Sequence, residues 1–375
     1  MSKYPLLKMP LQLHSARFMG SIRTALHRAY HWLAVSSLDK RGAAALSFAL
    51  LPISWLYGMG VNLRNTLYVW GFFRQNRLSI PVVSVGNVEV GGTGKTPLVI
   101  FLAEALSQSF RVGIVLRGYR GAYEHSKEGA LIVARGEGMA ASFGDEAALL
   151  AERLQEAIVV ISKDRMKGAQ LAIEKGANLI ILDDGMQHRR LYRDFEIVAI
   201  TPAFWKKTPQ FLPAGVLRDN KKEVKRADAI VSFTPFGEMK PFSAPQIEME
   251  SSLKEVVSIE SGEKVDIFGK KVAIFCGIAH PGRFEKSVKE LGAEVLLTLF
   301  LADHETPSPC MLSHFIQKAK EKGAQLLLCT EKDRVKLTPS KYPLPIASVK
   351  METRIKTNTS AWNELIKKIK ARGCR

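Results

Sequence analysis

The sequence predicts an α/β protein built on a mostly parallel sheet with helices on both faces. Two observations carry this prediction. Short apolar runs alternate with helical segments between residues 80 and 233, and a glycine-rich loop joins the first run to the first helix. Such alternation is typical of strand–helix–strand units, whose parallel strands are buried on both sides. The length of 375 residues exceeds one average domain and predicts a second, smaller α/β domain.

The first domain is expected to contain short buried strands separated by helices. Its apolar runs are rich in Val, Ile and Leu and are short, as buried parallel strands are. The expected strands cover residues 82–85, 112–116, 158–161, 179–182, 197–200 and 229–232, and the clearest helices cover 97–107, 145–154 and 166–175. Ligands of such folds bind at the carboxyl ends of the strands, which is where functional residues are expected.

A proline-rich, polar stretch at residues 234–246 breaks the pattern and predicts a domain boundary. A second set of elements follows at 271–276, 282–291, 295–300, 308–322, 325–329 and 346–349, and the amphipathic tail from Trp362 is expected to pack back on the fold. The predicted division is a basic extension at 1–41, an apolar membrane-associated helical segment at 42–78, a core domain at 79–235 and a smaller C-terminal α/β domain at 236–375.

Positive charge is concentrated near the N-terminus. The net charge is +18, and half of it lies in residues 1–77, which contain ten Lys or Arg against one acid. A nucleic-acid-dependent ATPase is expected to spread basic residues over its catalytic domain instead, so no nucleic-acid partner is predicted. Four scattered cysteines without a C-x-x-C pair argue against a zinc site or a disulfide framework. No obligate protein partner is inferred.

An uncharged run from Gly42 to Leu63 lies inside this basic region. Its length would span a bilayer, but Pro52 interrupts it and positive charge flanks both sides. Aromatic residues follow, as they do in segments that lie in the headgroup zone, and the basic residues would meet anionic lipid. We therefore expect a segment that lies in the membrane interface. The alternative for residues 42–73 is a buried helical hairpin of a soluble protein, and the Arg-rich, acid-poor first forty residues could also be a transit peptide.

The most specific motif is a glycine loop between the first strand and the first helix. Its backbone N–H groups and the helix N-terminus would cradle phosphates, Lys95 would reach the β- and γ-phosphates, and the Thr96 hydroxyl would bind Mg²⁺. This predicts a P-loop NTPase-like core that binds a nucleoside triphosphate. The expected nucleotide-binding residues are Glu89, Val90, Gly91, Gly92, Thr93, Gly94, Lys95 and Thr96, although the strict pattern has glycine where Glu89 stands. The alternative is an ordinary glycine-rich turn.

Carboxylates at the ends of other elements suggest the metal site and the base. Asp183 and Asp184 end an apolar strand, where P-loop proteins keep the acid that holds Mg²⁺. Asp145 and Glu146 begin a helix, where an N-cap and a dipole partner are the simpler interpretation. His188 could contact phosphate or lie on a solvated loop. Arg117 could hold an anionic group or cap the sheet.

Taken in order, these motifs resemble the tetraacyldisaccharide 4'-kinase family over roughly residues 42–337. The matching segments are Gly86-Asn87, Gly91-Gly92-Thr93-Gly94-Lys95-Thr96-Pro97, Arg117-Gly118-Tyr119, Gly144-Asp145-Glu146, Asp183-Asp184-Gly185-Met186-Gln187-His188, Pro213-Ala214-Gly215-Val216-Leu217-Arg218, Asp303-His304 and Thr330-Glu331-Lys332-Asp333. The resemblance implies transfer of the ATP γ-phosphoryl group to the 4'-hydroxyl of a tetraacyl glucosamine disaccharide 1-phosphate in lipid A biosynthesis. It also implies a site of action at the cytoplasmic face of the inner membrane of a Gram-negative-type envelope.

The resemblance further implies roles for individual residues. Asp145 and His304 would activate the hydroxyl, and Lys95 would act on the phosphates. Mg²⁺ would be served by Thr96, Glu146, Asp183 and Asp184, and the substrate by Arg117, Tyr119, Gln187, His188 and Arg218. The chain departs from the family where members often carry Glu after the arginine, because Asp219 and Asn220 follow Arg218 here.

One rival from another class is a membrane-associated P-loop GTPase or ATPase switch. Thr330-Glu331-Lys332-Asp333 follows an apolar strand, as a guanine-reading motif would, but its lysine stands one position late. Nucleotide preference distinguishes the switch from the kinase.

Overall fold

The computed structural model describes residues 40–119, 121–125, 129–136, 139–205, 210–239, 242–278, 281–302, 305–337 and 342–373, with only the backbone for 40–47 and 204. In these ranges twelve strands form one sheet in the order β10-β9-β11-β12-β8-β7-β6-β1-β5-β2-β4-β3. The expected α/β class is confirmed, since most neighbouring strands run parallel and helices cover the sheet.

The strands are β1 (Val82–Gly86), β2 (Val112–Leu116), β3 (Ala130–Ile132), β4 (Ile158–Ser162), β5 (Leu179–Asp183), β6 (Phe195–Ala199), β7 (Ala229–Ser232), β8 (Gln246–Ser258), β9 (Lys271–Cys276), β10 (Glu294–Phe300), β11 (Leu326–Thr330) and β12 (Ile346–Thr357). The helices are α2 (Lys40–Val69), α3 (Lys95–Ser107), α4 (Met139–Phe143), α5 (Asp145–Arg153), α6 (Arg165–Glu174), α7 (Pro202–Trp205), α8 (Pro281–Glu290), α9 (Pro309–Glu321), α10 (Glu331–Arg334) and α11 (Thr359–Gly373), with 3-10 turns η1 (Ala122–His125) and η2 (Lys221–Arg226).

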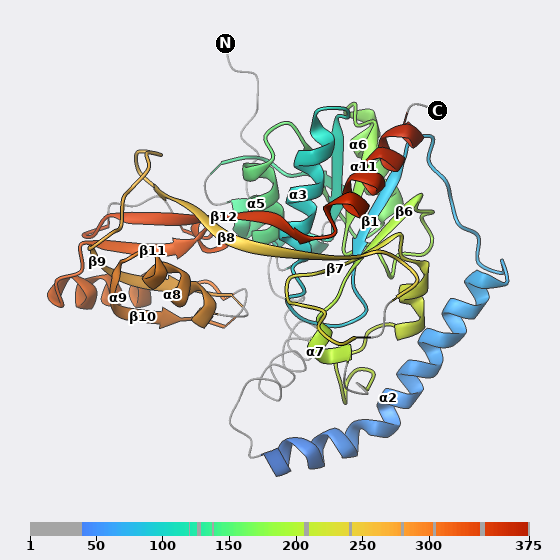
Figure 1. The fold of residues 1–375 in the computed structure, drawn as a ribbon, viewed down its shortest axis with the longest axis horizontal. Helices are drawn as coiled ribbons and strands as arrows, with labels where there is room; N and C mark the ends of the chain where they lie inside the picture. The colour runs from blue at the N-terminus through green and yellow to red at the C-terminus, as the bar shows by residue number, and fades with distance from the viewer. Residues whose placement is uncertain are drawn as a thin grey trace.

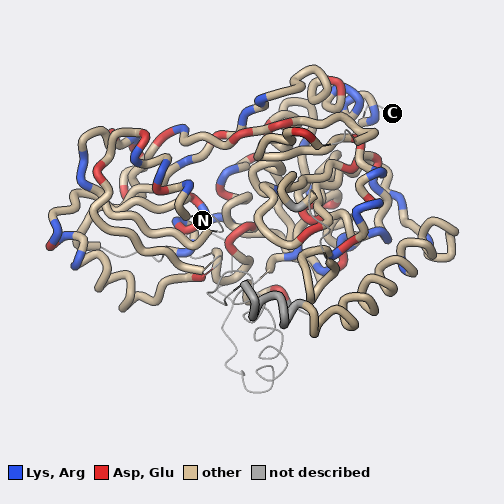
Figure 2. The backbone as a smooth tube through the Cα atoms, turned by 60° about the horizontal axis from the view of Figure 1, so that its bottom comes forward, with Lys and Arg blue, Asp and Glu red and all other residues tan. Residues whose placement is uncertain are grey.

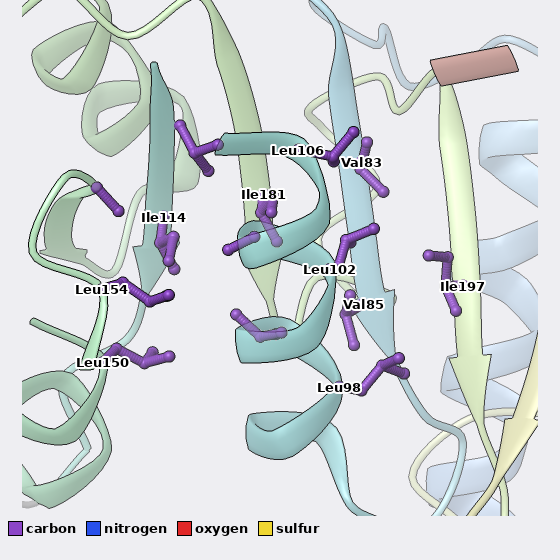
Figure 3. Packing of buried hydrophobic residues seen from close by; sticks show 14 of the residues in the cluster. Val83, Val85, Leu98, Leu102, Leu106, Ile114, Leu150, Leu154, Ile181 and Ile197 are labelled. Carbon is purple, nitrogen blue, oxygen red and sulfur yellow. The ribbon is translucent and has the colours of Figure 1, made fainter. Parts of the chain in front are cut away.

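The N-terminal lobe, which contains β1–β7, is covered by helices on both faces of its sheet. On one face, Leu98, Leu102 and Leu106 of α3 are fully buried against alternate residues of the strands (Figure 3). On the other face, Ala169 and Ala172 of α6 pack on the remaining strand residues, whose side chains point to that face. Side chains of a strand alternate between the two faces, so continuous apolar strands are the ones buried on both sides. This packing directs the carboxyl ends of β1, β2, β4 and β5 to one edge.

The C-terminal lobe, which contains β9–β11 with α8–α10, is joined to the N-terminal lobe through β8 and β12. These two long strands pair antiparallel, and β8 also pairs parallel with β7 (Figure 1). β8 was not among the strands expected from the sequence, and β12 continues beyond the expected 346–349. The tail packs back as expected: α11 returns to the N-terminal lobe, where Trp362 lies 5.2 Å from Phe101 between ring centroids.

The apolar N-terminal run forms one long helix, α2, which lies along the outside of the N-terminal lobe (Figure 1). The buried-hairpin alternative is wrong, because large apolar side chains of α2 and its continuation are exposed. They include Phe48, Trp55, Leu56, Met59, Leu63, Trp70 and Phe72, each at least 60% exposed. Figure 2 shows this helix almost free of charged residues. None of the helices in the described residues combines the length and hydropathy needed to cross a bilayer.

Polar residues fix α2 to the N-terminal lobe. Ser54 is fully buried; its hydroxyl donates to the Phe211 carbonyl and accepts from the Ala214 N–H, both at 2.8 Å. Asn65 is also buried and donates to Asp219 Oδ1 at 2.8 Å. The side of α2 that carries Ser54, Val61 and Asn65 therefore faces the protein, and large apolar side chains face outward.

Residues 1–39, and with them most of the expected basic extension, lie outside the described part of the chain.

Candidate functional site

The glycine loop has the backbone shape of a phosphate cradle. Gly94 adopts a left-handed conformation with φ of 85° directly before α3, and a side chain there would collide with the ring of Phe233. Gly91 has φ of 123°, where side chains are also strained. Thr93 Oγ1 accepts a hydrogen bond of 3.0 Å from the buried Asn87 amide, which fixes the loop. The first N–H groups of α3 therefore face the carboxyl edge of the sheet, where an anion is stabilised.

Asp184 is the charged centre that joins the predicted residues. Arg218 donates to both of its carboxylate oxygens, with Nη1 2.7 Å from Oδ2. Lys95 Nζ lies 3.6 Å from Oδ1. Burial opposes the carboxylate charge, but Arg218 and Lys95 outweigh it and hold the pKa of Asp184 well below its usual range. Asp184 also has φ of 57°, an uncommon conformation for a residue with a side chain.

Asp183 has the opposite electrostatics. Its carboxyl group is buried at 3% exposure, and this burial, together with the charges of Glu146 and Asp184, raises its pKa to about 7. A divalent cation would relieve this repulsion. Within the described ranges, no three His, Cys, Asp or Glu side chains form a cage of their own. Mg²⁺ ordinarily takes one or two carboxylates and completes its shell with substrate phosphates and water, so these carboxylates fit such an ion.

Asp145 is buried at the start of α5, but it is not the N-cap. Gly144 occupies that position with φ of 93°, and Asp145 is the first helical residue. Its Oδ1 accepts the N–H of Glu146 at 3.0 Å, while Oδ2 faces Lys332 at 3.8 Å and Lys336 at 3.7 Å. The capping interpretation of Asp145 is therefore wrong. His304 and its neighbour Asp303 lie outside the described residues.

Glu89 and Val90 contact the neighbouring loop instead of pointing along the glycine loop. Glu89 is 2% exposed, and its Oε1 accepts the Thr201 N–H at 2.8 Å. Burial raises the pKa of Glu89 against the opposing effect of the hydrogen bonds with Thr201. Val90 N donates to Val216 O at 2.8 Å. Glu89, which stands where the strict motif has glycine, thus stabilises the glycine loop through its contact with Thr201.

The expected substrate-binding residues divide into two groups. Gln187 donates to Asn87 O at 2.8 Å, and Arg218 contacts the Asn87 side chain, so both lie beside the glycine loop. Arg117 pairs with Glu124 at 3.3 Å, and Tyr119 is 37% exposed at the edge of the lobe.

His188 shares the electrostatic surroundings of Asp184. Burial, reinforced by the charge of Arg165, lowers the pKa of His188 to about 4, so its imidazole is neutral at pH 7.

Arg165 is the main site residue that the sequence analysis missed. It begins α6 directly after β4 and is 3% exposed. Burial lowers its pKa to about 10, partly offset by the charges of Asp184 and Asp183. The signal was present in the sequence, because Arg165 follows an apolar strand that ends at the same edge as Asp183.

Thr330 and Asp333 of the segment 330–333 stabilise the structure of the C-terminal lobe. Thr330 caps α10 by accepting the Asp333 N–H, and its hydroxyl donates to Asp333 Oδ2 at 2.6 Å. Asp333 Oδ1 accepts the Gly277 N–H at 3.0 Å. Both carboxylate oxygens of Asp333 thus accept hydrogen bonds from the protein, whereas an aspartate that recognises guanine would present its carboxylate to the nucleotide base.

Comparison with known proteins identifies the family of this chain. A family model described as tetraacyldisaccharide-1-P 4'-kinase matches residues 46–370. The tetraacyldisaccharide 4'-kinase of Aquifex aeolicus is 38% identical over 302 residues, covering 78% of this chain and 90% of that protein. The protein of the same name from Syntrophus aciditrophicus is 35% identical over 343 residues, covering 84% of this chain and 91% of that protein.

A crystal structure of LpxK from Aquifex aeolicus in complex with ATP is similar to this fold, with a TM-score of 0.71 and 35% identity. The similarity covers 86% of this chain and 99% of that chain. These findings favour a kinase over the GTPase switch. The chain belongs to the tetraacyldisaccharide-1-P 4'-kinase family and is an ATP-dependent kinase of lipid A biosynthesis.

Proposed function

We propose that the carboxyl edge of the N-terminal lobe carries the reaction of this family, the transfer of the γ-phosphoryl group of ATP to the 4'-hydroxyl of a tetraacyldisaccharide 1-phosphate. The observation that supports this most directly is the group formed by Lys95, Asp184 and Arg218 at the mouth of the glycine loop. In this proposal the two cations and the carboxylate would lie beside the phosphates of a bound nucleotide.

In this proposal each residue has one task. Lys95 neutralises charge on the transferred phosphoryl group, and the N-terminus of α3 holds the remaining phosphates. Asp183, Asp184, Glu146 and Thr96 would hold Mg²⁺, which would offset the negative charge of the phosphates. Arg218 fixes the orientation of the Asp184 carboxylate.

The hydroxyl proton is assigned to Asp145. As the 4'-oxygen bonds to the γ-phosphorus and the bond to ADP breaks, the proton passes to the carboxylate, with His304 as the proposed partner. Asp145 belongs to the N-terminal lobe, whereas Lys332 and Lys336 beside it belong to the C-terminal lobe. The domain boundary near residue 235 would then separate the nucleotide site from the C-terminal residues that contact the proposed base.

We also propose that α2 lies on an anionic membrane, at the cytoplasmic face of the inner membrane. Its apolar residues face away from the protein, while Ser54 and Asn65 hold its other side to the lobe. Tyr57 donates to the Arg218 carbonyl at 3.1 Å, so the helix touches the loop that carries a site residue. An acylated substrate embedded in the surface would reach the site beside this helix.

The test is incubation of the purified protein with γ-labelled ATP and extracted tetraacyldisaccharide 1-phosphate, followed by lipid chromatography. Label on the lipid, strongly reduced with Lys95→Ala, is the expected result. GTP in place of ATP should transfer less label. Nucleotide hydrolysis without any labelled lipid would refute the proposed transfer and point to a switch.

A further inference from the structure

Two lysines of the C-terminal lobe face the candidate base of the N-terminal lobe. The Nζ atoms of Lys332 and Lys336 lie 3.8 and 3.7 Å from Oδ2 of Asp145. The other oxygen, Oδ1, accepts the N–H of Glu146 at 3.0 Å. The three side chains are shielded from solvent, with exposures of 19% for Lys332, 3% for Lys336 and 8% for Asp145. The carboxylate is thus held from one side by its own helix and from the other by the second lobe.

Lys336 is itself held in place. Its Nζ donates to Asp333 Oδ1 at 3.0 Å and to the Glu305 carbonyl at 3.2 Å. Asp333 is 1% exposed and is fixed by the Gly277 N–H. A buried ammonium costs free energy to desolvate, and the hydrogen bonds of Lys336 with Asp333 and Glu305 offset that cost. Lys336 therefore forms a fixed point between Asp145 and the backbone of Glu305.

The carbonyl that Lys336 contacts belongs to the residue directly after His304. One ammonium group therefore connects the proposed base with the segment that carries its proposed partner. We propose that Lys332 and Lys336 are positioning residues, which orient the Asp145 carboxylate for proton transfer when the C-terminal lobe is docked. This inference rests on the proposed function, in which Asp145 is the base.

The two lysines are not needed merely to hold the lobes together, because other ion pairs join the same surfaces. Arg153 of α5 pairs with Glu331 of α10 at 3.0 Å, and Arg334 of α10 pairs with Glu152 of α5. These ion pairs join the same two helices without contact to Asp145. They also provide a matched control, because removing one of them weakens the lobe contact and leaves the base untouched.

The lysines are tested by steady-state kinetics with ATP and the lipid acceptor. Lys336→Met is expected to lower kcat by roughly 10- to 100-fold, as displacement of a reacting group does, with the KM for ATP nearly unchanged. Lys336→Arg should restore part of the loss, since it keeps the charge. Arg334→Gln should stay within about twofold of the wild type, because exposed ion pairs contribute little.

Thermal unfolding shows whether each variant is folded. If Lys336→Met does not fold, Lys332→Met replaces it, because that side chain is more exposed and also faces Asp145; a loss of kcat is expected there too.

A cycle with Asp145→Asn separates this inference from the proposed function. Asp145→Asn combined with Lys336→Met should be no slower than Asp145→Asn alone, because the lysine acts through the carboxylate. Wild-type activity in Asp145→Asn would refute the proposed base. Loss in Asp145→Asn with wild-type kcat in the folded lysine variants would overturn the inference alone. Multiplicative losses, or an equal loss in Arg334→Gln, would also overturn it.

Discussion

Arg218 donates to both carboxylate oxygens of Asp184 and so ties the end of β5 to the loop that α2 contacts. A planar guanidinium makes such a two-point contact, whereas a lysine ammonium is a single point charge. The arginine also balances the negative charge that Asp183 and Asp184 place side by side. The pair is therefore expected to orient a carboxylate that we propose holds Mg²⁺.

Arg218→Lys should lower phosphoryl transfer by about tenfold or more, because charge-assisted hydrogen bonds contribute roughly 1.5–3 kcal/mol each. The measurement is kcat with saturating ATP and acceptor. Arg226→Lys is the matched control, since Arg226 pairs with Glu223 at 2.8 Å and with Glu196 at 3.4 Å instead of Asp184. Equal effects in the two variants would show that the loss reflects general charge pairing.

Lys95→Ala and Thr96→Ala should each reduce transfer by about 10²–10³, the usual cost of one lost electrostatic contact to a transition state. Both residues open α3, and their replacement leaves the leucine face of that helix intact. Thermal unfolding should therefore change little. Wild-type turnover in either variant would remove that side chain from the mechanism.

Asp145→Asn should cut kcat by roughly 10²–10⁴. Because Gly144, and not Asp145, is the N-cap, the substitution removes no side-chain cap of α5. The expected combination is a large kinetic effect with a small effect on thermal unfolding. An unfolding midpoint that falls in proportion to activity would indicate a structural role for the carboxylate.

The pH dependence of stability is expected to reflect Asp183. Burial raises the pKa of Asp183 in the folded protein to about 7, so the folded state holds a proton that the unfolded state releases near the ordinary aspartate pKa of 3.8. Stability of the magnesium-free protein should thus fall as the pH rises through this interval and level off above about 7. Asp183→Asn should remove that decline. Added Mg²⁺ should stabilise the wild type more at pH 8 than at pH 6, as measured by thermal unfolding.

Leu56→Glu with Met59→Glu should weaken binding of the protein to anionic lipid vesicles by at least about tenfold, since burying one large apolar side chain contributes about 1.5–3 kcal/mol. Both residues are more than 60% exposed on the outer side of α2. Phe268→Glu is the control, because Phe268 is 78% exposed in the C-terminal lobe. Vesicle sedimentation measures the effect. Equal sedimentation of all three proteins would refute the membrane role of this face.

Point variants are preferable to removal of residues 1–73. That deletion is also expected to release the protein from membranes and to lower lipid phosphorylation more than ATP binding. However, it would expose the Asp219 carboxylate that Asn65 and Arg64 now satisfy. The point variants change the outer side alone.

The sequence predicted most of the strands that are buried on both faces and missed β3 and β8, which are partly exposed. β1, β2, β5 and β7 are continuous apolar runs, and their ends fall within a residue of expectation. β8 alternates between buried and exposed positions irregularly, because it forms a ribbon with β12 that is partly open to solvent. Such a strand has no periodic signal to read.

The sequence predicted the candidate site residues that follow a strand, but not the contacts between residues far apart in the chain. Lys95, Asp183 and Asp184 could be found because each ends or follows an apolar run. The contact of Asp145 with Lys336 joins distant parts of the chain across two lobes, and no local pattern reports it. The burial of Ser54 and Asn65 was also missed, because polar residues beside apolar ones on a helix are expected to face solvent.

The orientation of α2 also affects how the enzyme meets its acylated acceptor. If its outer side rests on lipid, the enzyme and its acylated acceptor diffuse in the same plane, and their search for one another becomes two-dimensional. The acyl chains need not leave the bilayer, so only the sugar headgroup has to rise to the glycine loop. Tyr57 and Ser54, which bind the loop of Arg218, then fix the height of the catalytic edge above that plane.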